Sequence, residues 1–569
     1  MLKGVAASSG IAIGPAYFVK EPGQKLPRYS LPAEKIPAEK ARLLQAFTAT
    51  QKQLEDIRDD LAFRGRPQEA AIFEAHLLLL ADPILADAVN ALMNQGLNAE
   101  AAVSDAGENC AALFDGLEDE YLRERGADIR DICGRWLSNL TGKADSFQNL
   151  SQPSIIFARC LAPSQAAMLD ESKVLAIVTE TGGKTCHSAI IARAMEIPAV
   201  VGVGPFDYSL ADGRTVIVDG KSGNIFLNPD PRLISEYRQQ MQQELAQKAK
   251  MQKTVRFPAQ TRDGKEFQLA ANISSPEDME KALASGAQGV GLYRTEFLYM
   301  DRPGLPTEEE QVHAYRTVLE AFPHQPVIIR TLDIGGDKEL PSLQAEKELN
   351  PFLGVRGIRL CLARPGIFKI QLRAILRAGL AGAPWIMLPM VTVLEEVRRT
   401  KVLLKEAESE LTAEGLPFSS AYKLGIMVET PAAAVLTSHF APEVDFFSIG
   451  TNDLTQYTCA ADRTNEKVTH LHDSFHPAVL QLIETVINSA HERGKPVGMC
   501  GEMAADPLAT PLLAAMGLDE FSLSPAHIPL IKEVIRGLDV RECQQLWQQA
   551  RQLADGREIR SLLEQAATI

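Results

Sequence analysis

The sequence predicts a multidomain α/β protein: an α/β domain interrupted by an inserted helical bundle, followed by a (β/α)₈ barrel of the TIM type. Three observations lead to this prediction. The chain has 569 residues, which is too many for a single domain of roughly 150 residues. Its pattern changes from short apolar strands to long helical periodicity and back within the first 230 residues. From Gln268 onward, short apolar strands alternate with helical stretches, which is typical of a barrel.

The α/β domain is expected to begin in residues 1–20, where apolar residues alternate and glycines supply the turns. From about Ala33 to Thr141 glycines are few, and apolar residues such as Leu43, Phe47 and Leu54 recur at four- and seven-residue spacings. This periodicity predicts four or more helices, two of which form a long hairpin.

Residues 145–230 return to short strands and glycine turns. Strands are expected at Val174–Val178, Ala199–Val203 and Thr215–Val218. This segment predicts the remaining body of the fold that residues 1–20 begin, so the helical region is an insertion into one α/β domain.

Residues 231–254 are rich in glutamine, lysine and glutamate and are polar on nearly every side, which is typical of an exposed helix that links two domains. The strands expected in the barrel are short apolar runs with helical connections between them. They are residues 270–273, 289–293, 327–330, 353–356, 385–388, 424–428, 446–449 and 497–499.

Charge and cysteine content narrow the class of protein. With 58 basic and 73 acidic residues the net charge is −15 and the pI is near 5.3, which disfavours nucleic-acid binding. The acidic balance suits docking of a basic protein partner if the acid clusters on one face. No apolar run reaches the ~18 residues of a membrane span, and the N-terminus lacks a signal-peptide pattern. The eight cysteines are scattered, so we expect buried thiols in a reducing cytoplasm.

A candidate nucleophile is His187 in the segment Gly182-Gly-Lys-Thr-Cys-His-Ser-Ala-Ile-Ile-Ala-Arg193. An expected strand leads through the two glycines to the histidine, and an apolar helical run follows. Free backbone N–H groups and the helix dipole favour an anion at such a helix start. A neutral imidazole is a good phosphoryl acceptor near neutral pH. On spacing alone, the commoner interpretation is a histidine whose hydrogen bonds are satisfied within a turn, with the glycines serving only the backbone.

Polar side chains follow many of the strands expected in the barrel, where such barrels place their active sites. They are Arg294, Arg330, Arg356, Glu429, Asn452, Asp453, Asp462, Arg463 and Cys500. Each of the first three ends an expected strand. Several guanidinium groups can clamp a carboxylate and a phosphate, and two carboxylates with room for water suit Mg²⁺. Together they would neutralise charge in phosphoryl transfer. Any one of them alone is interpreted as a surface ion pair, but their recurrence after strands favours a common site.

Two further residues have competing interpretations. Cys500 is either a buried structural thiol or a proton donor to carbon. His76 lies on an apolar helical face and, taken alone, is interpreted as a packed histidine. With Glu69, Glu74 and Asp82 nearby it can also border a protein-docking surface.

Several long motifs occur in one order along the whole chain. They are Gly4–Ala16, the segment around His187, Gly289–Asp301, Asp333–Lys338, Asn350–Gly354 and Gly498–Met503. In these residues the sequence resembles enzyme I of the phosphoenolpyruvate-dependent sugar phosphotransferase system.

The resemblance implies domains and partners as well as an activity. The implied parts are a swivelling phosphohistidine domain at 1–20 and 144–230, an inserted helical domain at 21–143 that docks the phosphocarrier protein HPr, a linker helix at 231–256, and a phosphoenolpyruvate-binding, dimerising barrel at 257–569. The implied reaction moves the phosphoryl group of phosphoenolpyruvate to the enzyme and then to a histidine of HPr, which releases pyruvate and begins sugar uptake. A cytoplasmic homodimer is expected.

The resemblance also implies individual roles. His187 would be phosphorylated and Cys500 would protonate the enolate carbon. Arg294, Arg330, Asn452 and Arg463 would bind substrate, with Arg356 in a lesser role. Glu429 and Asp453 would bind Mg²⁺.

One residue departs from the family pattern, because Cys186 stands where a serine usually precedes the active histidine. A weaker hydrogen bond near the phosphoryl group is the expected consequence.

Two alternatives stay open. A pyruvate-phosphate dikinase or phosphoenolpyruvate synthase would share the histidine and the barrel but needs an ATP-binding domain where this chain has only the helical insertion. A weakly catalytic paralogue that binds the carrier as a regulator is disfavoured by the intact candidates at every catalytic position.

Overall fold

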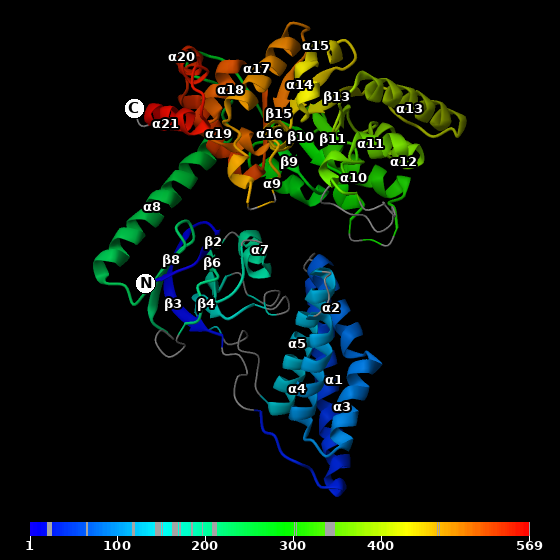
Figure 1. Cartoon of the computed structure of the whole chain (residues 1–569), viewed down its shortest axis with the longest axis vertical. Helices are drawn as coiled ribbons and strands as arrows, with labels where there is room; N and C mark the ends of the chain where they lie inside the picture. Colours follow the sequence, from blue (N-terminus) through cyan, green and yellow to red (C-terminus); the bar gives the residue numbers. More distant parts are fainter. Residues whose placement is uncertain are drawn as a thin grey trace. The chain divides into compact units, whose positions relative to one another are not determined.

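The computed structural model divides the chain into two compact units, Met1–Leu245 and Ala246–Ile569 (Figure 1). The residues described are 1–19, 26–63, 67–115, 120–142, 150, 152–161, 165, 169, 172–183, 186–195, 197–206, 213–300, 302, 304–335, 348–463, 465 and 467–567.

The first unit contains a sheet whose strands come from both sides of the helical insertion. Within the described residues it has eight strands in the order β1-β8-β7-β3-β4-β5-β6-β2. The strands are β1 (Leu2–Lys3), β2 (Val5–Ser8), β3 (Ile11–Phe18), β4 (Ser154–Ala158), β5 (Val174–Thr179), β6 (Ala199–Val201), β7 (Thr215–Asp219) and β8 (Asn224–Leu227). Strand β3 pairs in parallel with β4 and antiparallel with β7. The prediction that the later segment completes the fold begun by the first residues is therefore confirmed. Strands β4 and β8 also lie in the segment 145–230, where short strands were expected, but they were not among the examples named.

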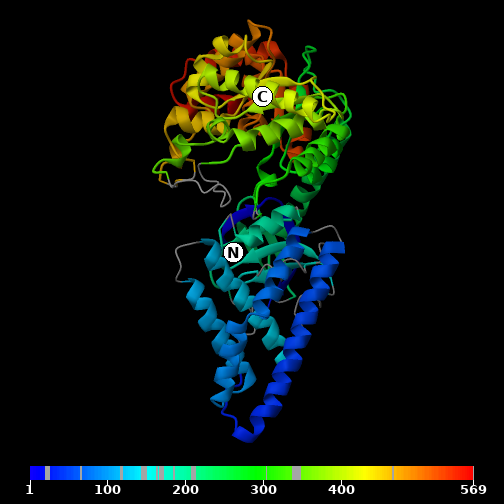
Figure 2. The same ribbon diagram turned by 90° about the vertical axis from the view of Figure 1, so that its right-hand side faces the viewer.

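The helical region lies between β3 and β4. Its helices are α1 (Ile36–Phe63), α2 (Pro67–Leu80), α3 (Pro83–Asn94), α4 (Ala99–Asp115) and α5 (Glu120–Thr141). They run side by side (Figure 2), with α1 against α2 and α4 against α5, around a core that includes Leu54, Phe73, Val89 and Trp136. The prediction of four or more helices is confirmed.

The helix expected at 231–254 is α8 (Pro231–Thr254), and it leads into the second unit. There the strands form a closed parallel barrel in the order β9 to β16, which confirms the predicted (β/α)₈ class. They are β9 (Gln268–Ile273), β10 (Val290–Arg294), β11 (Val327–Arg330), β12 (Pro384–Leu388), β13 (Lys423–Val428), β14 (Phe446–Ile449), β15 (Val497–Met499) and β16 (Glu520–Leu523). The helices around and beyond them are α9 (Met279–Ala284), α10 (Glu308–Ala321), α11 (Ile358–Ala363), α12 (Pro365–Ala378), α13 (Leu394–Ala413), α14 (Pro431–Val435), α15 (Thr437–Phe440), α16 (Thr451–Cys459), α17 (Pro477–His491), α18 (Thr510–Met516), α19 (Ile528–Gly537), α20 (Val540–Ala550) and α21 (Gly556–Ala567).

The prediction of one barrel strand, at residues 353–356, was wrong. Leu353 ends a short 3₁₀ turn (Pro351–Leu353), and residues 354–356 form a loop that leads to α11. Leu353 and Val355 are 66% and 48% exposed, whereas strands of a parallel barrel are buried on both faces. The eighth strand is instead β16.

Strand β16 escaped notice because two of its four residues are polar. Glu520 and Ser522 are buried, and both approach Gly291 of β10 so closely that a Cβ there would meet them. They therefore point into the barrel, where an apolar cluster that includes Leu292, Met387 and Phe446 also lies. An apolar run was the signal used for the other strands, and this one lacks it.

In the part of the chain that the structure describes, no helix is both long enough and apolar enough to cross a bilayer.

Candidate active site

A pocket of about 290 Å³ opens at the C-terminal ends of the barrel strands. Its lining residues are Leu292, Arg294, Arg330, Asp333, Gly335, Arg356, Met427, Glu429, Gly450, Asn452, Asp453, Arg463, Cys500, Gly501 and Glu502. Of the polar residues that the sequence predicted after the barrel strands, all but Asp462 are among them. His187 belongs to the first unit, and residues 336–338 of the Asp333–Lys338 motif lie outside the described residues.

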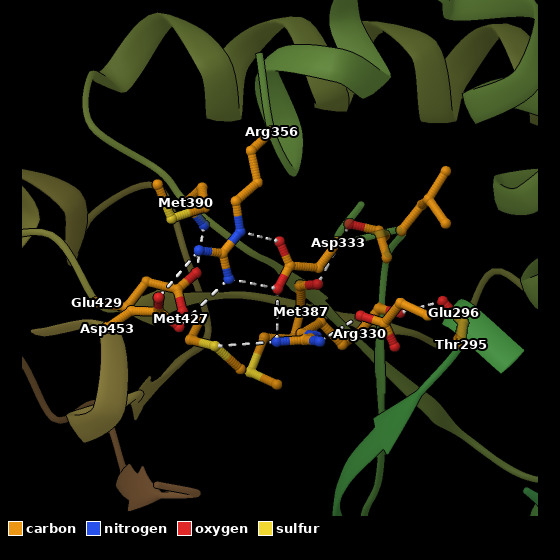
Figure 3. Close-up of polar contacts among 12 residues, drawn as sticks. Thr295, Glu296, Arg330, Asp333, Arg356, Met387, Met390, Met427, Glu429 and Asp453 are labelled. Carbon is orange, nitrogen blue, oxygen red and sulfur yellow. Dashed lines mark hydrogen bonds and ion pairs between the residues drawn. The ribbon is translucent and has the colours of Figure 1, made fainter. Parts of the chain in front are cut away.

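Two of the four arginines are fixed by buried carboxylates (Figure 3). Arg330, at the end of β11, pairs with Glu296 and, at 2.9 Å, with Asp333. Arg356 bonds Asp333 through Nε at 3.0 Å and Asp453 through Nη1 at 2.9 Å. These carboxylates raise the pKa of both guanidinium groups against the opposing effect of burial.

The position of Arg356 corrects the sequence prediction that it ends a strand. It reaches the pocket from the loop before α11. The tight turn there depends on Gly357, whose φ is +59° and which has Met390 Cβ only 3.0 Å from where its own Cβ would lie. A larger residue would meet both strain and a clash.

The other two arginines, Arg294 and Arg463, have no carboxylate within ion-pair distance among the described residues. Arg294 ends β10 and its side chain is exposed at the mouth of the pocket. Desolvation by the surrounding protein, and then repulsion from the positive charge of Arg330, lowers the pKa of Arg294. Arg463 follows α16, and its backbone N–H donates to Gln456 Oε1 at 3.1 Å. Both guanidinium groups are therefore available to an anion in the pocket.

Glu429 and Asp453 are the two carboxylates that the family resemblance assigns to Mg²⁺. Glu429 follows β13, and its Oε1 accepts a 2.5 Å hydrogen bond from the backbone N–H of Met390, which has a φ of +58°. Its Oε2 is buried and has no partner among the described residues. Burial, then repulsion from Asp453 and Asp333, raises the pKa of Glu429 to about 8. An orphaned buried oxygen whose charge is disfavoured in this way fits a cation ligand.

Apart from these two carboxylates, the described residues offer few groups that could ligate a metal. No group of three or more histidine, cysteine, aspartate or glutamate side chains arranged to hold a metal is found in the described part of the chain. Two carboxylates alone suit Mg²⁺, since that ion keeps waters and takes oxygens from phosphate substrates.

Asn452 is held by a residue that the sequence reasoning missed. On α16, its Nδ2 donates to Glu502 Oε1 at 3.2 Å, and its Oδ1 accepts from the Glu502 backbone N–H at 3.0 Å. The second N–H of the amide remains for another acceptor. Glu502 lies two residues after Cys500 and within the Gly498–Met503 motif, and this position was the available signal.

Cys500 follows β15 and is buried at the base of the pocket, with Sγ 3.8 Å from the Ile449 carbonyl oxygen. Burial raises its pKa to about 11. The group is therefore a thiol at neutral pH, which is the protonated form that a proton donor needs.

His187 is the first residue of α7 (His187–Ala194), as the sequence predicted for a helix start. Its side chain lies outside the described residues, as do Lys184 and Thr185. Cys186 occupies the N-cap position without a side-chain cap, and its carbonyl accepts from the Ala189 N–H at 2.9 Å. The N–H groups of His187 and Ser188 are therefore the ones that can meet an anion at this helix start. Gly182, with a φ of +113°, makes room for Cys186 Sγ, which would lie 2.8 Å from a Cβ at that position.

His76 is buried in the helical region, and its Nε2 lies 3.4 Å from Asp128 Oδ1. Asp82 accepts a hydrogen bond from the Ile84 N–H and caps α3. The packed interpretation suits this histidine. Glu74 is exposed, and the side chain of Glu69 is outside the described residues.

Family models match the chain in the order of its parts. The PEP-utilising enzyme N-terminal model matches residues 3–125, the PEP-utilising enzyme mobile domain matches 150–223, and the PEP-utilising enzyme PEP-binding domain matches 248–540. The barrel, the mobile domain and the arginine-lined pocket thus define an enzyme of the phosphoenolpyruvate-utilising class.

Relatives of nearly equal length define the family within that class. A phosphoenolpyruvate-protein phosphotransferase of Geobacillus stearothermophilus is 46% identical over 100% of this chain and 98% of its own. One of Bacillus subtilis (strain 168) is 45% identical over 95% of each chain. A solution structure of an Enzyme I protein is 37% identical and covers 43% of this chain and 99% of its own, with a TM-score of 0.38. The chain belongs to the phosphoenolpyruvate-protein phosphotransferase family.

Proposed function

We propose that this enzyme transfers the phosphoryl group of phosphoenolpyruvate to its own His187 and then to a histidine of a small phosphocarrier protein, HPr. The observation that carries the proposal is the pocket. Arg294 and Arg463, which have no carboxylate partner in the described chain, line it together with two buried carboxylates and the Cys500 thiol. Such a site is built to hold an anion that carries both a carboxylate and a phosphate.

The substrate anion would be held chiefly by Arg294 and Arg463, since these have no carboxylate partner in the described chain. Arg330 would add its charge from a position fixed by Glu296 and Asp333. Asn452 would supply its remaining N–H to a phosphate or enol oxygen.

Mg²⁺ would be held by Glu429 and Asp453, with the other ligands from water and substrate oxygens. When bound, it would neutralise charge on the transferring phosphoryl group. The orphaned Glu429 Oε2 supports this assignment.

In the first half-reaction an imidazole nitrogen of His187 attacks phosphorus, and the bond from phosphorus to the enol oxygen breaks. The enolate carbon takes the proton of the Cys500 thiol, which gives pyruvate, and water later restores that proton. The start of α7 favours the phosphorylated state because its free N–H groups and dipole stabilise an anion.

The remaining assignments belong to the same proposal. The helical region, 21–143, would dock the carrier, and the domain at 1–20 and 144–230 would swivel on the linker at 231–256 between carrier and barrel. The barrel at 257–569 would form the homodimer. A cytoplasmic location and a role in sugar uptake follow from the carrier.

Intact-protein mass spectrometry after mixing with phosphoenolpyruvate, with and without Mg²⁺, tests the first half-reaction. We expect a Mg²⁺-dependent gain of one acid-labile phosphoryl group that is lost in His187→Ala and kept in His313→Ala, a matched change at an exposed histidine of α10. No gain in the wild type, or a gain that persists in His187→Ala, would contradict the proposal and favour a regulatory carrier-binding protein.

A further inference from the structure

Arg356 bridges two carboxylates that have different surroundings (Figure 3). Toward Asp333 it donates from Nε at 3.0 Å and from Nη2 at 3.1 Å. Toward Asp453 it donates from Nη1 at 2.9 Å and from Nη2 at 3.3 Å. Both contacts are forked, and all three side chains are less than one-tenth exposed.

We propose that Arg356 is an internal counter-cation that holds Asp453 in the metal-free enzyme and releases it when a divalent cation binds. Asp333 keeps hold of the arginine throughout. This inference rests on the proposed function, because that function assigns Asp453 and Glu429 to the metal.

The charges of the buried cluster support an exchange of cations. Its acidic members are Glu296, Asp333, Glu429 and Asp453, and its basic members are Arg330 and Arg356. Binding a cation requires Glu429 and Asp453 to be ionised. Four negative charges then face two positive ones, so a divalent cation would balance the cluster. Burying unbalanced charge is costly, and Arg356 reduces that cost at Asp453 while the cation is absent.

Asp453 is the partner that Arg356 can give up. Asp333 Oδ2 also receives Nη1 of Arg330 at 2.9 Å, so Asp333 is held by two arginines. Asp453 has the more exposed side chain, 9% against 1% for Asp333. Glu429 receives the Met390 N–H on Oε1 and leaves Oε2 open, so both metal candidates have an oxygen to offer once Arg356 moves.

Arg356 has an alternative set of partners after release. Its Nη1 lies 3.4 Å from Tyr457 Oη, and that hydroxyl donates to the Phe352 carbonyl at 2.6 Å. Arg356 lines the pocket, so the edge of its guanidinium group freed from Asp453 would be able to meet an anion there. Metal binding would therefore add a cation for the substrate, which couples the two binding events.

Binding of Mn²⁺ alone to the full chain, measured by the paramagnetic signal of the free ion, tests the exchange. We expect Arg356→Met to bind Mn²⁺ roughly tenfold or more tightly than wild type, because the ion no longer displaces charge-assisted hydrogen bonds. The control is Arg359→Met, which removes the same charge three residues away. The Arg359 guanidinium contacts two carbonyls and the Thr392 hydroxyl, so we expect wild-type affinity.

Equal or weaker Mn²⁺ binding by Arg356→Met, or equal tightening by Arg359→Met, would overturn the counter-cation role while the proposed reaction stands. Absence of Mn²⁺ binding in all three proteins would overturn the metal assignment itself, and the counter-cation with it.

Arg356→Lys covers the case in which the methionine variant fails to fold. Lysine keeps the charge but cannot bond both aspartates with a fork. We expect Mn²⁺ to raise the thermal unfolding temperature of Arg356→Lys by more than it raises that of wild type. An equal or smaller rise would contradict the proposal.

Discussion

Glu520 offers a sharp test of the electrostatics inside the barrel. This β16 carboxyl is buried, and its Oε1 has no hydrogen-bond partner among the described residues. It lies against Gly291, where a Cβ would stand 2.4 Å from Oε1, and against Gly498. Replacing it with glutamine keeps the shape and removes the charge.

The size of the expected change in stability follows from the pKa of the Glu520 carboxyl. Burial, and to a smaller extent Asp519, raises the pKa of Glu520 from 4.5 to about 7. At about 1.4 kcal/mol per pH unit, this difference corresponds to roughly 3 kcal/mol. Between the two values the unfolded chain has lost a proton that the folded barrel keeps, so stability falls as pH rises. The cost is absent well below pH 4.5 and complete above pH 7.

We therefore expect Glu520→Gln to stabilise the barrel by about 3 kcal/mol at pH 8 and by less than about 1 kcal/mol at pH 5. Urea unfolding of the full chain measures this. A Trp136→Phe background leaves Trp385 and Trp547, both in the barrel, as the fluorescent probes. Exposed Glu492→Gln is the control, with no pH-dependent difference expected. A gain that is constant from pH 5 to 8, or a loss at pH 8, would refute the reasoning.

Two other predictions concern packing and chemistry. Gly291→Ala should lower barrel stability by about 1–3 kcal/mol, because its Cβ would lie 2.3 Å from Ser522 Oγ; the same unfolding assay should show no such loss for Gly366→Ala, which meets open space. Cys500→Ala should slow pyruvate formation by about 10²–10⁴-fold in rapid-quench measurements, since it removes the proton donor. The control Cys543→Ala removes another buried thiol and should leave the rate of pyruvate formation unchanged. A rate close to wild type in Cys500→Ala would exclude Cys500 as the proton donor.

Local patterns in the sequence were enough to predict the classes of structure. Apolar periodicity located the helical insertion, and short apolar runs located seven barrel strands. The start of α7 at His187 followed from the glycine turn and the apolar run beyond it. These features depend on neighbours along the chain, which is why a single sequence reveals them.

The predictions from sequence were wrong where segments distant in the chain determine whether a residue is buried. Leu353 and Val355 look like a strand, but in the described structure both side chains are exposed. Glu520 and Ser522 look like a loop, but Gly291 on another strand leaves room for them inside the barrel. Burial of a short segment is a property of its surroundings, and the sequence of the segment does not contain it.

The sequence by itself determined which residues carry charge at the ends of the barrel strands, and hence the kind of chemistry available. Only the tertiary structure decided how those charges are paired. It binds Arg330 and Arg356 to buried carboxylates and leaves Arg294 and Arg463 without such partners in the described chain. The physical reason is that ion pairing depends on distances of a few ångströms between side chains. Most of these pairs join residues tens of positions apart, and only closure of the barrel sets those distances.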